Sequence, residues 1–170
     1  MSTAAHLRAR GVRVRVFGEP MVSWDAHMPA GMLLKSTPVA SSIDAPQRGH
    51  TLVDYCDAAG LPRLITDEDI IPVETFVGYG RWFQEKLVPG LERVRVVSVD
   101  QRQAGGFEVK LDSGEQFAAR AVVVATGLSG LARGAPGRRA AAAARALAAG
   151  ARPPRPPPPP PPPLRGPQRE

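Results

Sequence analysis

Cysteine, histidine and long apolar runs are scarce or absent in this 170-residue sequence. Cys56 is the single cysteine, which excludes an intramolecular disulfide, and its place on the inner face of a predicted helix favours a buried apolar role over a reactive thiol. The three histidines are scattered at unrelated spacings, so we expect no metal site. No apolar run approaches the ~18 residues of a membrane-spanning helix, and no signal-peptide pattern is present, so a cytoplasmic protein without a membrane partner is expected.

A basic surface is also absent from most of the chain, although the net charge is +6. Residues 1–130 carry a net charge of −1, and residues 131–170 carry a net charge of +7. Recognition of nucleic acid requires basic side chains clustered on a folded face. Because the excess of positive charge lies in residues 131–170 and residues 1–130 are nearly neutral, we expect no nucleic-acid partner.

Residues 131–170 lack the varied apolar side chains of a packed core. They hold 12 of the 19 prolines and consist almost entirely of Ala, Gly, Pro and Arg. Such a composition buries too little apolar surface to offset the entropy lost on folding. We therefore expect a partial domain over residues 1–130 and a disordered tail over residues 131–170.

The N-terminal residues indicate a helix followed at once by a strand. Residues 4–10 have the pattern of the last turns of a helix, and Gly11 suits the left-handed conformation just past a helix end. Residues 12–17 alternate as in a strand. This is the second half of a βαβ unit, whose first strand and loop are missing from the sequence. Residues 18–50 then form a long loop whose apolar residues favour a packed, functional segment.

Two further helices follow in the middle of the chain. Thr51 and Asp54 have the spacing of a capping box, and Gly60 is expected to end the helix that they begin. A second helix is predicted from Val73 to Leu87. Apolar residues share one face of each helix, namely Leu52, Tyr55, Cys56 and Ala59 in the first and Val73, Phe76, Gly80, Phe83 and Leu87 in the second.

The remaining pattern predicts an antiparallel unit and then a buried strand. Residues 94–100, 107–111 and 115–120 are strand candidates, with a Gly-containing turn before the last of them. Residues 121–127 are a continuous apolar run, as expected for a parallel strand buried on both faces. Ligands of parallel sheets bind beyond the carboxyl ends of the strands, which places residues 125–127 at a candidate site.

Two sequence motifs in this layout are similar to those of a known enzyme family. Residues 23–36 (SWDAHMPAGMLLKS) and 73–83 (VETFVGYGRWF) resemble the flavin-dependent monooxygenases that N-hydroxylate ornithine or lysine, and their bacterial relatives. The resemblance covers about residues 4–130. It implies an α/β fold, an incomplete Rossmann-like FAD/NAD(P)-binding domain with a parallel sheet and a small antiparallel unit. It also implies FAD and NAD(P)H as cofactors of the intact relative, with a small molecule as substrate.

The resemblance further implies roles for five residues near the cofactor. Glu19 lies one residue beyond the position whose carboxylate bonds the adenosine ribose, so a solvated loop charge is an equal alternative. Val96 matches the position whose backbone meets the adenine, although its side chain alone would be assigned to the core. Ala125, Thr126 and Gly127 match the turn that passes close to the flavin, where glycine permits close backbone approach.

The loop of residues 24–36 would lie beside the flavin ring. Trp24 and Met28 are equally compatible with core packing, and His27 is more often a structural histidine. Lys35 is a candidate partner for cofactor phosphates or a substrate carboxylate, with a solvated lysine as the alternative. No residue is assigned a catalytic role, and the substrate of the hydroxylases does not transfer.

The sequence differs at both ends from the family that it resembles. Met1-Ser2-Thr3 stands where a glycine-rich pyrophosphate loop precedes the first helix, and residues 131–170 stand where a nicotinamide-binding domain should follow. The tail's four main residue types share GC-rich codons, which suggests a shifted reading frame or a misassembled gene model. We therefore expect a fragment that is inactive alone.

Two other interpretations remain open at this point. The eight prolines of residues 156–163 favour a polyproline helix, which an interaction protein would present to a partner module lined with aromatic residues. A different nucleotide-binding enzyme with a parallel sheet, such as a methyltransferase, would also contain a Val-rich strand. The antiparallel unit before residues 121–127 favours the flavoprotein layout over the methyltransferase.

Overall fold

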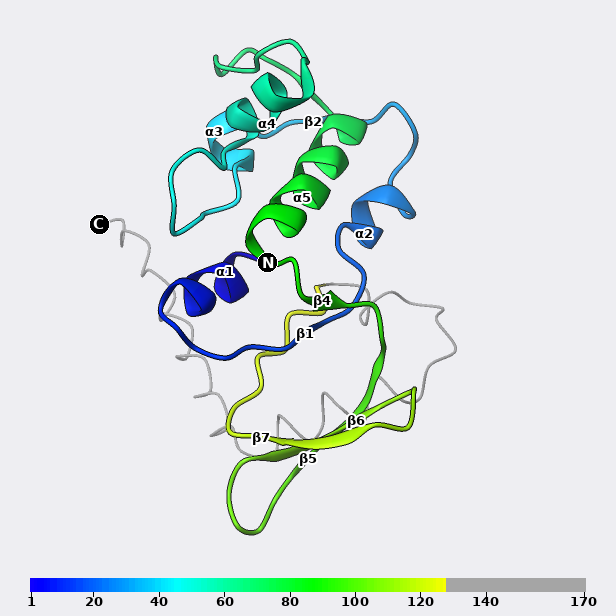
Figure 1. Ribbon diagram of the computed structural model, residues 1–170. Helices are drawn as coiled ribbons and strands as arrows, with labels where there is room; N and C mark the ends of the chain where they lie inside the picture. The colour runs from blue at the N-terminus through cyan, green and yellow to red at the C-terminus, as the bar shows by residue number, and fades with distance from the viewer. Residues whose placement is uncertain (128–170) are drawn as a thin grey trace, which may run out of the picture. The chain divides into compact units, whose positions relative to one another are not determined.

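Helix α5 (Val73–Leu87) is the longest helix in the computed structural model, which describes residues 1–127 (Figure 1). The predicted tail of residues 131–170 lies outside the described residues. The other helices are α1 (Ser2–Ala9), α2 (Val22–Asp25), α3 (Pro38–Ser41) and α4 (Leu52–Ala59). The strands are β1 (Val16–Phe17), β2 (Leu33–Leu34), β3 (Ile71–Pro72), β4 (Leu91–Glu92), β5 (Val96–Gln101), β6 (Phe107–Leu111) and β7 (Gln116–Ala119).

The local signals that predicted α4 are confirmed. The Thr51 Oγ1 accepts the Asp54 amide at 3.3 Å, and the Thr51 amide donates to Asp54 Oδ2 at 2.7 Å, which completes the capping box. Gly60 ends the helix in the left-handed conformation, with φ +65°. Leu52 and Cys56 are fully buried, but Ala59 is exposed, so the predicted apolar face ends one turn early.

The core is assembled on helix α5, whose predicted bounds are confirmed. Tyr79 is fully buried there, and its hydroxyl accepts the Ile43 amide at 2.8 Å and donates to the His50 carbonyl at 2.8 Å. Burial raises the pKa of Tyr79 to about 12. The buried residues that pack together are Ala4, Ala5, Leu52, Ile71, Tyr79, Phe83 and Val88. Segments far apart in the sequence therefore meet on one helix.

The described strands form three small sheets. Strand β1 pairs with β4 in parallel, and β2 pairs with β3 in antiparallel fashion, each over two residues. Strands β5, β6 and β7 form an antiparallel sheet in that order, which confirms the predicted antiparallel unit. The architecture is a mixture of helix and sheet that is compatible with an incomplete α/β flavoprotein domain.

Arg15 joins the parallel pair to the antiparallel sheet. Its guanidinium binds the Glu92 carboxylate with two contacts of 2.8 and 2.7 Å and the Glu115 carboxylate with two contacts of 2.6 and 3.0 Å. It also lies 4.9 Å from the ring centroid of Phe17 and 4.4 Å from that of Phe117. The hydrogen bonds from Arg15 hold the pKa values of both glutamates below their usual range.

Two strand predictions are wrong. Residues 12–15 are not in a strand, and the ladder of β1 includes only Val16 and Phe17. Residues 121–127 form no strand and no ladder, and Val123 and Val124 are 65% and 50% exposed. The two segments, both expected as strands of one parallel sheet, therefore do not share a sheet among the described residues.

These two predictions failed because an alternating or apolar pattern only favours a strand. A strand forms where a neighbouring strand satisfies its backbone N–H and C=O groups. In the described part of the chain, β1 pairs with β4 instead, and residues 121–127 have no strand beside them. The described strands thus do not form a single parallel sheet, and the Rossmann-like arrangement is not established by them.

Close packing at Gly78 provides a test of the α4–α5 contact. A Cβ added at Gly78 would overlap the hydroxyl oxygen of Tyr55, whose ring is packed against those of Tyr79 and Trp82. Overpacking of this kind costs about 1–3 kcal/mol, against a gain of about 1 kcal/mol from replacing glycine in a helix. We expect Gly78→Ala to lower the free energy of unfolding measured with urea. Tyr55→Phe removes the overlapping oxygen and should recover part of that loss in the double variant.

The control for Gly78→Ala is Gly90→Ala, because the nearest atom to a Cβ at Gly90 is the Arg8 Nη1 at 3.7 Å. That substitution should change the free energy of unfolding by less than about 0.5 kcal/mol. Strictly additive effects of Gly78→Ala and Tyr55→Phe would contradict the packing described.

Charged substitutions in residues 121–127 test whether this run is exposed. We expect Val123→Asp and Val124→Asp to leave the free energy of unfolding within about 0.5 kcal/mol of the parent, because both side chains face solvent. Val109→Asp in β6 is the control: Val109 is 4% exposed, and an unpaired buried carboxylate is strongly destabilising. Urea unfolding, monitored by circular dichroism, measures the free energy of unfolding of the three variants. If all three lose the same amount of it, residues 121–127 are buried.

Candidate functional site

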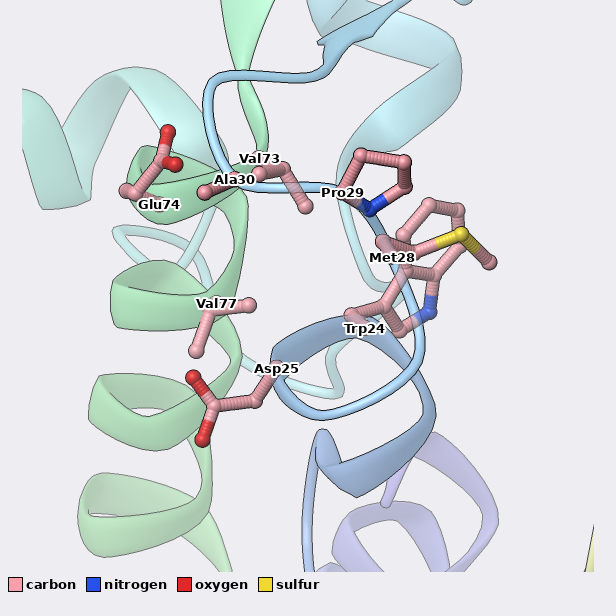
Figure 2. A pocket seen from close by; sticks show the side chains of 8 residues that line it. All are labelled: Trp24, Asp25, Met28, Pro29, Ala30, Val73, Glu74 and Val77. Carbon is pink, nitrogen blue, oxygen red and sulfur yellow. The ribbon is translucent and has the colours of Figure 1, made fainter.

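A small cleft lies between helix α5 and the segment that begins with α2. Its volume is about 250 Å³, and Figure 2 shows α2 and the following loop on one side and α5 on the other. Pockets for drug-sized ligands are typically ~300–1,000 Å³, so this cleft suits a small group rather than a three-ring flavin. Its lining residues are Trp24, Asp25, Met28, Pro29, Ala30, Val73, Glu74 and Val77.

Helix α2 is positioned by an unusual backbone conformation and by a glycine. Met21, which precedes the helix, has φ +64°, a left-handed conformation that non-glycine residues rarely adopt. Its side chain occupies the space that a Cβ of Gly80 would fill. Trp24 then packs edge-on against Phe76 with ring centroids 4.9 Å apart. These contacts fix Trp24 beside the N-terminal half of α5.

Two carboxylates border the apolar walls of the cleft. The Asp25 carboxylate extends toward α5 in Figure 2 and forms an ion pair with Arg81 at 2.6 Å. Glu74 Oε1 accepts the Gly31 amide at 2.8 Å, and this hydrogen bond holds the pKa of Glu74 below its usual range. Each carboxylate therefore fastens the loop of residues 25–31 to α5.

The structure brings together only part of the predicted flavin-side loop. Trp24 and Met28 line the cleft, whereas His27 and Lys35 are exposed and are not among its lining residues. Asp25 and Glu74 were not predicted as site residues, although both lie within the two motifs that carried the resemblance. Their charge inside those motifs is the signal that would have identified them.

The predicted cofactor residues lie outside this cleft. Glu19 follows β1, and its carboxylate is about half exposed, 3.9 Å from Arg93 Nε. Val96 opens β5 opposite Leu111 and is half-buried. Ala125, Thr126 and Gly127 are all exposed, and Gly127 has φ +62°. The exposed positions are accessible to a ligand, but none of the five lines the cleft.

The described residues fit FAD only in part. The Glu19 carboxylate is accessible to ribose hydroxyls. A pyrophosphate, however, binds to backbone amides at a helix N-terminus that follows a glycine-rich turn. Helix α1 begins at Ser2 after Met1, with no glycine before Gly11. Within residues 1–127, α1 is thus not preceded by a glycine-rich turn.

Residues 1–127 contain no group of three His, Cys, Asp or Glu side chains that could hold a metal ion. Within the same range, no helix has both the length and the apolar character needed to cross a bilayer.

Comparison with known proteins gives one family match. The family model of flavin containing amine oxidoreductases matches residues 88–153. The match covers β4 to β7 and residues 121–127 and continues past the described residues. No curated protein matches the chain. The match supports an FAD-dependent oxidoreductase family and FAD as the cofactor, and it does not distinguish the N-hydroxylase class.

The hydrogen bond between Glu74 and Gly31 predicts a pH-dependent signal at the cleft. The pKa of Glu74 is lowered, so the bond should be intact above the usual glutamate pKa of about 4.3 and weaken as pH falls through the lower folded value. We expect the Gly31 amide proton shift, measured by NMR, to titrate with a midpoint below that usual value. Glu74→Gln should abolish the titration, and Glu85→Gln, further along α5, should not. A midpoint at or above the usual value would contradict the geometry.

Proposed function

We propose that this chain is part of a cytoplasmic FAD- and NAD(P)H-dependent oxidoreductase, a monooxygenase that hydroxylates a small substrate. The observation that carries the proposal is the match of residues 88–153 to flavin containing amine oxidoreductases. The antiparallel sheet β5–β7, directly followed by the Val-rich run that ends at Gly127, supports it. The polyproline segment of residues 156–163 lies outside the described residues and adds no support for an interaction protein.

The cofactor and the protein would have different roles in this reaction. The flavin would supply the redox chemistry, while the protein binds and orients it and excludes water. Glu19 would hold the adenosine ribose, Val96 would meet the adenine through its backbone, and Gly127 would admit the flavin closely. The cleft with Trp24 and Met28 would hold a small part of the substrate, because its volume excludes the flavin ring.

Direct oxidation of an amine is the second candidate function. The matching family is named for amine oxidoreductases, and the cleft has two carboxylates beside an indole ring, which suits a cationic group. The two candidates differ in their reductant. A monooxygenase consumes NAD(P)H together with dioxygen, whereas an amine oxidoreductase takes its electrons from the amine itself.

The first test measures how much FAD the 170-residue chain binds. We expect no stoichiometric FAD in the visible spectrum after dialysis and no NADPH oxidation, because long side chains such as Lys35 do not replace a preorganised backbone cradle. Fusing a strand and a Gly-x-Gly-x-x-Gly loop ahead of α1 should create FAD binding. Flavin bound at one equivalent by the original chain would contradict the first expectation, and no binding by the folded, extended chain would contradict the proposal.

A substitution at Glu19 then tests the ribose contact in the extended chain. Hydrogen bonds to a charged group contribute about 1.5–3 kcal/mol, so Glu19→Gln should weaken FAD binding by roughly tenfold or more. Glu68→Gln, at another exposed acidic residue, is the matched control and should leave the dissociation constant unchanged. Equal affinities for the two variants would remove Glu19 from the site.

A further inference from the structure

The side chains that line the cleft between α2 and α5 are apolar or anionic. Six of the eight lining residues are apolar or aromatic, the other two are Asp25 and Glu74, and none is a lysine, arginine or histidine. Figure 2 shows Trp24 and Met28 on the side of α2 and its loop, with Val77 of α5 opposite. A group that complements these walls is therefore positively charged and yet apolar over most of its surface.

The two carboxylates differ in how far their charge is already balanced. Asp25 forms an ion pair with the Arg81 guanidinium at 2.6 Å. Glu74 accepts the Gly31 amide at 2.8 Å, which is an uncharged partner, and within residues 1–127 no ion pair involves Glu74. The hydrogen bond from Gly31 lowers the pKa of Glu74, so this carboxylate is ionised at neutral pH. Glu74 therefore supplies an uncompensated negative charge at the cleft.

The indole of Trp24 adds a second attraction for a cation. This ring is half-buried, lines the cleft, and packs against Phe76 with ring centroids 4.9 Å apart. Among aromatic side chains, tryptophan attracts a cation most strongly. Met28 contributes a polarisable thioether to the same wall. One cleft thus combines a negative charge, an aromatic ring and soft apolar surface.

Hydrogen bonding distinguishes between the cations that are small enough for this cleft. A primary ammonium group has three N–H donors, and it loses strong hydrogen bonds to water when it enters an apolar cleft. Here one oxygen of each carboxylate already has a partner, and the remaining lining side chains offer no oxygen acceptor. A quaternary ammonium group has no N–H donor to satisfy, and it is still attracted by Glu74 and by the indole. A trimethylammonium group is also compact enough for a volume of about 250 Å³.

We propose that this cleft binds the quaternary ammonium end of a small molecule. The inference deepens the proposed function and rests on it in one respect, namely that the bound molecule is the substrate. A quaternary nitrogen has neither a lone pair nor an N–H bond, so it is itself neither hydroxylated nor dehydrogenated. The cleft would therefore anchor the charged end of the substrate, while oxidation takes place at another atom. This arrangement agrees with a cleft too small for the flavin ring.

Binding is measured on the 170-residue chain without FAD, by NMR titration of the Met28 methyl signal at constant ionic strength. Three probes share a hydroxyethyl arm: choline, its uncharged isostere with a tert-butyl group in place of trimethylammonium, and ethanolamine with a primary ammonium group. We expect choline to bind with a dissociation constant in the millimolar range and several-fold more tightly than either of the others. The Trp24 indole N–H signal should shift with it, whereas that of Trp82, outside the cleft, should not.

Two substitutions separate the charge from the ring. Glu74→Gln keeps an oxygen for the Gly31 amide but removes the charge, so it should weaken choline binding about fivefold or more and leave the uncharged isostere unaffected. Glu85→Gln, at another exposed residue of α5, is the matched control and should retain the parent affinity. Trp24→Leu keeps an apolar side chain without the ring and should also weaken choline binding, as read from Met28.

Several outcomes would overturn the proposal. These are no shift at Met28 with choline, equal or tighter binding of ethanolamine or of the uncharged isostere, and unchanged choline affinity in folded Glu74→Gln. Each result is independent of the flavin, because no probe requires FAD. Failure of the extended chain to bind FAD would therefore count against the proposed function alone, whereas failure of choline to bind would count against this site alone.

Discussion

The buried hydroxyl of Tyr79 is the interaction on which the rest of this structure depends. A buried hydroxyl without partners is costly, and here both partners are backbone groups of the loop between α3 and α4. Satisfying the hydroxyl therefore draws residues 43 and 50 onto α5. With that face of α5 committed to the core, another face is left for α2 and the cleft.

The cleft depends on the absence of a Cβ at Gly80. That glycine leaves room for the side chain of Met21, whose left-handed backbone turns the chain into α2. Trp24 and Asp25 reach α5 because of that turn. The cleft is thus a product of helix–helix packing, and its carboxylates are held by neighbouring groups rather than by a ligand. This favours a preformed recognition surface over one assembled on binding.

Local signals in the sequence predict the helices better than the strands. Helix α4 begins after its cap Thr51 and ends at Gly60, and α5 is recognisable by the apolar residues on one of its faces. Both helices are therefore determined by residues that are close in sequence. The only signal in residues 121–127 is that they are apolar. Whether such a run becomes a strand depends on a neighbouring strand from another part of the sequence. The same limit applies to the site: Trp24 and Met28 were identifiable as motif residues, but the pairing of Asp25 with Arg81 spans 56 positions and requires the fold.

The parallel ladder of β1 and β4 is only two residues long, and the Arg15 contacts that reinforce it lie at the protein surface. Where so few bonds join neighbouring elements, we expect local opening to precede global unfolding. The amides of β6 should then exchange with solvent faster than those of α5, whose buried face contains Tyr79. Order in the antiparallel sheet could thus be lost while the helical core is retained.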